Sequence, residues 1–237
     1  MKSSTTRTPR RTFLGRALGA AAMGLPFVAT RTISAQESPA DGWLKDVKGT
    51  HRCLFDFPQH KNGAGLLHIL NYLNTYKEAY KTGPGQVGAV GTFYAIGSQA
   101  SISMGFNDAT WAKYKLGEYT GLKDAAGKPY TRNVFRSPTK NDLHVLMQAF
   151  QTPTIPAFAD AMPALGIESL QKMGTKFLMC ANALGGWCLE LEARGKGKAA
   201  DIEKDLRANV LPGVTIVPAM VIAIEQAQAA GIRYNRQ

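Results

Sequence analysis

The stretch Arg52–Tyr94 contains RCLFDF (Arg52–Phe57), then AGLLHILNYLNTYKEAY (Ala64–Tyr80), and then VGAVGTFY (Val87–Tyr94). The first and third segments are short apolar runs next to proline or glycine, a pattern typical of buried strands. In the middle segment, leucines and tyrosines recur at helical spacing. A strand, a helix of about seventeen residues and a second strand together predict a right-handed βαβ unit.

The same alternation returns in the C-terminal third of the chain. Apolar runs at Lys176–Cys180 (KFLMC) and Val214–Val217 predict two further strands. Helical patterns accompany them at 182–193, 200–210 and 219–230. Alternating strands and helices joined by short turns are typical of an α/β fold, a mostly parallel sheet with helices on both faces. No linker-like break divides residues 51–237, so we expect one domain there.

Residues 95–160 separate these two blocks and show weaker periodicity. Within them we expect a helix at 106–116 capped by Asn107 or Asp108, a loop at 120–140, a short helix at 142–150 and an ordered, proline-rich loop at 152–163.

The charge balance raises the question of nucleic-acid binding. The chain has 28 Lys+Arg and 17 Asp+Glu, a formal net charge of +11. Six of the basic residues fall within residues 1–35, which contain no acidic residue. Without them the net charge is +5 and the remaining charges are dispersed. We therefore expect no nucleic-acid partner.

Residues 1–35 have the order of an export signal. The pair Arg10-Arg11 is followed by Thr-Phe-Leu and then by a weakly apolar run, Leu14–Ala29, an arrangement that resembles the twin-arginine signal. This run is shorter than the roughly 20 residues of a membrane-spanning helix. We therefore predict a signal peptide at 1–35 read by the twin-arginine export machinery, a linker at 36–50, and a periplasmic product without stable membrane insertion.

Cys180 is the leading candidate for chemistry. It ends a predicted strand and directly precedes a predicted helix. Ligands of open α/β sheets bind beyond the carboxyl ends of the strands, and a helix N-terminus favours a thiolate. Asn182 is placed to cap that helix or to orient a bound group. A buried cysteine that only fills space in the core is an equally open interpretation of Cys180.

The other two cysteines do not indicate a metal site or a disulfide. Cys53 lies inside the first predicted strand and is expected in the core, and Cys188 lies eight residues beyond Cys180. The spacing matches no CxxC motif and no histidine is adjacent, so no metal is expected. Eight residues across a strand–helix joint also argue against a disulfide between Cys180 and Cys188.

His60 is a weaker candidate, as a base or a ligand. It lies in the loop after the first strand, which also opens at a strand's carboxyl end and could share a crevice with Cys180. The alternative is a solvated loop histidine. Tyr72 and Tyr76 are expected to pack in the core or an interface rather than to form a stacking platform. No complete phosphate-loop motif and no GxSxG motif occurs, so no cofactor is assigned.

The C-terminal third also carries a series of short motifs. They are FLMCANAL (Phe177–Leu184), LPG (Leu211–Gly213), VPA (Val217–Ala219), and Ala227-Gln228 followed by Gly231 and Tyr234. This series resembles the DsrE/DsrF-like family, in whose exported relatives a strand ending in Cys precedes an Asn-containing helix. The resemblance runs from about residue 50 to 235. It implies a compact α/β fold assembled as a trimer or hexamer, with residues 95–160 as an insertion.

The resemblance also implies a function. Some members of the family carry sulfur as a cysteine persulfide, and in this chain that role would fall to Cys180. We therefore expect a periplasmic sulfur-handling protein, a persulfide carrier or sulfurtransferase. Two alternatives stay open. One is a non-catalytic small-molecule-binding or assembly protein of the same fold, and the other, suggested by the export route alone, is a cofactor-loaded redox protein.

Overall fold

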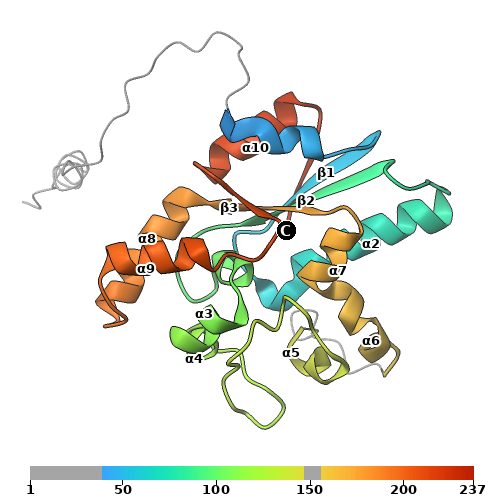
Figure 1. Cartoon of the computed structure of the whole chain (residues 1–237). Helices are drawn as coiled ribbons and strands as arrows, with labels where there is room; N and C mark the ends of the chain where they lie inside the picture. The colour runs from blue at the N-terminus through green and yellow to red at the C-terminus, as the bar shows by residue number, and fades with distance from the viewer. Residues whose placement is uncertain (1–38, 147–155) are drawn as a thin grey trace, which may run out of the picture. The chain divides into compact units, whose positions relative to one another are not determined.

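The computed structural model describes residues 39–146 and 156–237 (Figure 1). The predicted signal peptide and the start of the predicted linker lie outside these residues. The described residues form a five-stranded, all-parallel sheet with the strand order β4-β3-β2-β1-β5. The strands are β1 (His51–Asp56), β2 (Val87–Phe93), β3 (Lys176–Cys180), β4 (Val214–Val217) and β5 (Arg233–Arg236). The α/β fold predicted from the sequence is thus confirmed.

Helices connect the strands and cover both faces of the sheet. They are α2 (Ala64–Ala79), α3 (Asp108–Lys113), α4 (Leu116–Thr120), α5 (Leu143–Leu146), α6 (Pro156–Ala161), α7 (Ile167–Lys172), α8 (Ala181–Ala193), α9 (Ala199–Ala208) and α10 (Met220–Ala229). Five 3-10 helices are also described: Pro39–Asp46, Lys61–Gly63, Ser101–Gly105, Lys140–Asp142 and Met162–Leu165. Over the described ranges, none of the helices combines the length and the apolar character that crossing a membrane requires.

The unit β1–α2–β2 forms as the sequence predicts. β1 and β2 pair in parallel, with Leu54 beside Val90. The chain enters α2 through Gly63, whose φ of 84° lies in the left-handed region that glycine adopts without steric cost. The helix then buries a stripe of aliphatic side chains, including Leu66 and Ile69, against the sheet.

The sheet separates two apolar cores. On one face, Phe93 and Phe177 stack with ring centroids 5.0 Å apart, and this core continues into α2, α7, α8 and α9. On the other face, α10 and the 3-10 helix Pro39–Asp46 lie together over the sheet (Figure 1). Trp43 of that 3-10 helix is buried in the second core. Part of the predicted linker 36–50 is therefore packed structure.

The described part of the 95–160 region is tied to the first core by two asparagines. Asn107 caps α3, as predicted, because its side chain accepts the N–H of Thr110 at 3.0 Å. Asn133 is buried, and its amide donates to the carbonyls of Met104 and Phe106 at 2.8 and 2.7 Å. These bonds order the predicted loop 120–140 without regular secondary structure.

Residues 152–163 differ from the predicted loop. α6 begins at Pro156, and the 3-10 helix Met162–Leu165 follows it. Proline suits the first turn of a helix, because an N–H there has no partner within the helix. Residues 147–155, which contain part of the predicted helix 142–150 and the start of the predicted loop, lie outside the described residues.

Strand β5 is not predicted by the sequence pattern. Gly231, at a φ of 78°, follows the end of α10, and the chain then pairs with β1, with Cys53 beside Arg233. All four residues of β5 are exposed, so no apolar run or alternation marks it. β5 pairs in parallel with β1 and so becomes an edge strand of the sheet.

Candidate functional site

Four adjacent strands each contribute a polar side chain to the carboxyl edge of the sheet. Cys180 ends β3, Tyr94 follows β2, Asp56 ends β1, and Tyr234 lies in β5. Tyr94 packs against the apolar cluster that contains Cys180 and Leu54. Tyr234 pairs with Leu54, and Asp56 lies two residues beyond Leu54, so strand alternation turns all four to one face. We call these residues the carboxyl-edge row.

Cys180 is held by backbone donors from the starts of two helices. It is the N-cap of α8, and its Sγ accepts the N–H of Ala183 at 3.4 Å. The N–H of Met220, the first residue of α10, donates to the same sulfur at 3.4 Å. Both helix dipoles therefore direct partial positive charge at one sulfur. The Cys180 residue is 6% exposed.

The other two cysteines are in a different environment. Cys53 and Cys188 are buried in the first core, and burial raises the pKa of each thiol to about 11. The only hydrogen bond of the Cys53 thiol in the described structure is donated to the carbonyl of Leu54. All three cysteines are free, in agreement with the argument against a disulfide. The three thiols thus differ, because Cys180 alone among them has two backbone donors on its sulfur.

Asp56 forms the polar centre of the carboxyl-edge row. Its carboxylate is 2% exposed and accepts the hydroxyl of Tyr234 at 2.7 Å and that of Thr92 at 3.3 Å. Burial raises the pKa of Tyr94, and interaction with the Asp56 carboxylate raises it further. Arg236 opposes this effect on Tyr94. The cluster therefore keeps both tyrosines as neutral hydroxyls beside one buried acid.

His60 does not share a site with Cys180. Its backbone N–H donates to Gln99, and its Nδ1 accepts the N–H of Asn62 at 3.1 Å. The ring lies 5.5 Å from that of Phe135, in the first core, whereas Cys180 belongs to the second. The residue is 1% exposed rather than solvated. Burial lowers its pKa to about 4, partly offset by a hydrogen bond with the Ser98 backbone, so the ring is neutral at physiological pH.

Asn182 lies in the first turn of α8 with an exposed side chain. Its backbone N–H donates to the carbonyl of Pro218 at 3.3 Å. The capping role that the sequence suggested for its side chain is filled by the sulfur of Cys180. Asn182 therefore lies beside the Cys180 site, where its amide faces solvent.

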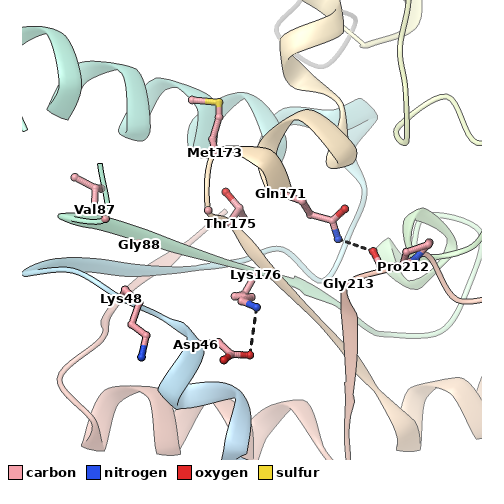
Figure 2. A pocket seen from close by; sticks show the side chains of 12 residues that line it. Asp46, Lys48, Val87, Gly88, Gln171, Met173, Thr175, Lys176, Pro212 and Gly213 are labelled. Carbon is pink, nitrogen blue, oxygen red and sulfur yellow. Dashed lines mark hydrogen bonds and ion pairs between the residues drawn. The ribbon is translucent and has the colours of Figure 1, made fainter. Parts of the chain in front are cut away.

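A pocket of about 620 Å³ lies at the opposite, amino ends of β2, β3 and β4 (Figure 2). Figure 2 shows Lys176 directed at Asp46, with an N–O distance of 3.2 Å, and Gln171 directed at Pro212. Ligands of parallel α/β sheets bind at the carboxyl ends of the strands. This pocket is therefore separate from Cys180 and from the carboxyl-edge row.

No group of three or more His, Cys, Asp or Glu side chains in the described ranges is arranged to hold a metal ion. The partners available at the carboxyl edge are a thiol, backbone N–H groups, one carboxylate and two tyrosine hydroxyls. Such a set suits nucleophilic and hydrogen-bonding chemistry.

Sequence reasoning found Cys180 but missed Asp56, Tyr94 and Tyr234. The alternation in RCLFDF (Arg52–Phe57) already turns Asp56 to the face of Leu54. Tyr94 was available as the last residue of the predicted second strand. Tyr234 had no such signal, since its strand carries no apolar pattern.

No family model, no curated protein and no solved structure matches this chain.

Proposed function

We propose that this protein handles sulfur through Cys180, as a persulfide carrier or sulfurtransferase of the DsrE/DsrF-like kind. The observation that carries the proposal is the pair of backbone N–H groups, from Ala183 and Met220, on the Cys180 sulfur. Backbone donors at helix starts favour the thiolate over the thiol, and the thiolate is the nucleophile in sulfur transfer.

The proposed step uses a sulfane donor such as thiosulfate. The Cys180 thiol first loses its proton to solvent. The thiolate then attacks the outer sulfur of thiosulfate, a new S–S bond forms, and the S–S bond of the donor breaks with its electron pair leaving on sulfite. The product is a Cys180 persulfide anion. The two N–H groups on Sγ remain as fixed dipoles beside the negative charge.

Intact-mass spectrometry tests this proposal directly. Exposure of the native protein to thiosulfate or polysulfide should add about 32 Da, one sulfur atom, to Cys180. Cys180→Ser should abolish the adduct, whereas Cys53→Ala and Cys188→Ala should retain it. No adduct on wild type, or an adduct that survives Cys180→Ser, would refute the proposal.

The small exposure of Cys180 favours a second candidate, a binding or assembly protein without turnover. The two candidates differ in the rate at which a small thiol reagent labels native Cys180. A sulfur carrier requires labelling of Cys180 well before Cys188, which is buried and has a raised pKa. Labelling of both cysteines only after unfolding would instead support the binding protein.

We also propose the periplasm as the location and a trimer or hexamer as the assembly. The support is the twin-arginine pattern of residues 1–35 and the motif resemblance. Cell fractionation of wild type and of an Arg10→Lys/Arg11→Lys variant tests the first, because a cytoplasmic wild-type protein would exclude it. Light scattering of the processed protein tests the second, and a monomer would exclude it.

A further inference from the structure

A second surface lies between α2 and β5, on the other face of the sheet from Cys180. There, one face of the helix and the last residues of the chain enclose a groove of about 730 Å³. This volume is within the range of small-molecule sites, which is roughly 300–1,000 Å³. The groove is on the Phe55 side of the sheet, which is the first core, whereas Cys180 belongs to the second.

Three tyrosines, one per helical turn, line the groove along α2. Tyr72 and Tyr76 have ring centroids 5.0 Å apart, and Tyr76 and Tyr80 follow at 5.1 Å. The ring planes are inclined by 70° between Tyr72 and Tyr76 and by 37° between Tyr76 and Tyr80. Tyr80 is 70% exposed, and Tyr76 is backed by His51, whose ring stacks on it at 4.5 Å. The sequence pattern favoured packing for Tyr72 and Tyr76. Tyr72 does pack against the first core, and both rings also form part of the wall of the groove.

The polar groups of the groove are neutral amides and hydroxyls. Asn71 accepts the hydroxyl of Thr75, and the amide of Gln237 donates to Asn235 at 2.9 Å. Gln237 also bonds His68, and burial lowers the pKa of His68, so that ring is neutral as well. Each amide offers both donors and acceptors, and these contacts leave part of that capacity unused.

Arg236 lines the groove with its backbone rather than with its charged side chain. It lies two residues beyond Tyr234, so its side chain turns to the face of Asp56. Burial and the Asp56 carboxylate raise the pKa of Tyr234, and Arg236 partly opposes this effect. The N–H of Gln237 donates to the carbonyl of Asp56 in β1. Because backbone groups of successive strand residues point in opposite directions, those of Arg236 face away from β1 and towards the open edge.

We propose that this groove binds a neutral saccharide chain. The C–H face of a sugar ring carries partial positive charge and stacks on the negative face of an aromatic ring. Its hydroxyls need donors and acceptors at close spacing, which the amides and the edge of β5 supply. An anionic ligand would require a cation directed into the groove. Arg236 is the lining residue of β5 with a fixed positive charge, and strand alternation turns its side chain to the face of Asp56.

Ligand-observed NMR with the intact protein tests the proposal. The probes are maltohexaose, cellohexaose and chitohexaose, with hexagalacturonate as the anionic comparison and indole as the planar aromatic comparison. At least one neutral hexasaccharide should bind with a Kd near or below about 1 mM. Neither hexagalacturonate nor indole should displace it.

The variants separate ring stacking from apolar contact. Tyr80→Phe keeps the ring and should bind within about twofold of wild type, whereas Tyr80→Leu should weaken binding roughly twofold to tenfold. Leu189→Ala, at an exposed position of α8, should change nothing. Binding by none of the neutral saccharides, binding of indole alone, or equal affinity of Tyr80→Phe and Tyr80→Leu would overturn the proposal. Because Cys180 takes no part, these results are independent of the sulfur adduct.

Discussion

Lowering the pH from about 7 to about 5 should destabilise the protein by about 2 kcal/mol through His60 alone. The ring is 1% exposed, and burial lowers its pKa from 6.5 to about 4. Its Nδ1 already accepts the N–H of Asn62, so protonation at that atom would replace a hydrogen bond with two opposed N–H groups. The Nε2 atom is buried, and the Ser98 backbone only partly offsets the cost of charging the ring.

The direction of this change in stability follows from whether the folded or the unfolded chain takes up the proton at the higher pH. As the pH falls below 6.5, the unfolded chain protonates His60 while the folded protein keeps it neutral. Stability that is fully present above pH 6.5 is therefore lost as the pH falls towards 4. Integrated over that whole window, the loss is about 3 kcal/mol, of which about 2 kcal/mol falls above pH 5.

Urea unfolding of wild type and His60→Asn at both pH values measures this contribution. Asparagine is the matched replacement, because its Oδ1 can accept the N–H of Asn62 in place of Nδ1. The variant should lose about 2 kcal/mol less than wild type between the two pH values. The pKa of His68 is also lowered, so only the difference between variants isolates His60. Equal losses in wild type and His60→Asn would refute the reasoning.

Three further substitutions test single contacts in the site and in the first core, each by equilibrium unfolding. Tyr234→Phe should cost about 1–2 kcal/mol, because it removes a 2.7 Å hydrogen bond from the buried Asp56 carboxylate; an unchanged midpoint would mean that water replaces the hydroxyl. Asn133→Ala should cost about 3 kcal/mol or more, since it leaves two buried carbonyls without their donor, and a loss below 1 kcal/mol would contradict the tie between the 120–140 loop and the core. Gly91→Ala should cost about 1–3 kcal/mol, because the new methyl group would lie 2.5 Å from the Phe177 ring, and a neutral effect would show that this ring can move.

The elements that the sequence predicts well are those whose apolar period is unambiguous. β3 and β4 coincide with the predicted runs 176–180 and 214–217, and α2 occupies almost the whole of the predicted 64–80. In each, burial of one face or both dictates the residue pattern. The predictions fail where the residue pattern does not reflect burial. An example is α6, which begins in the proline-rich stretch that was predicted to be a loop.

The candidate site also has a part that the sequence predicts and a part that it does not. Cys180 was predictable because one strand and the following helix fix its position at a carboxyl end. The donor from Met220 and the cluster around Asp56 depend on strands far apart in the sequence lying side by side. His60 shows the limit of reasoning from loop position, since its loop opens at the same edge but its ring turns into the opposite core.

By itself, the sequence determined the α/β class, the positions along the chain of four of the five strands described, and the thiol at the end of the third, because local periodicity and turn residues encode these properties. Only the tertiary structure decided which helix starts meet at that thiol, which acid lies between the two tyrosines, and that Tyr72 and Tyr76 line a groove. Those outcomes depend on strand order and on pairing by the exposed strand β5. No local pattern specifies either, since both depend on contacts between segments that lie far apart in the sequence.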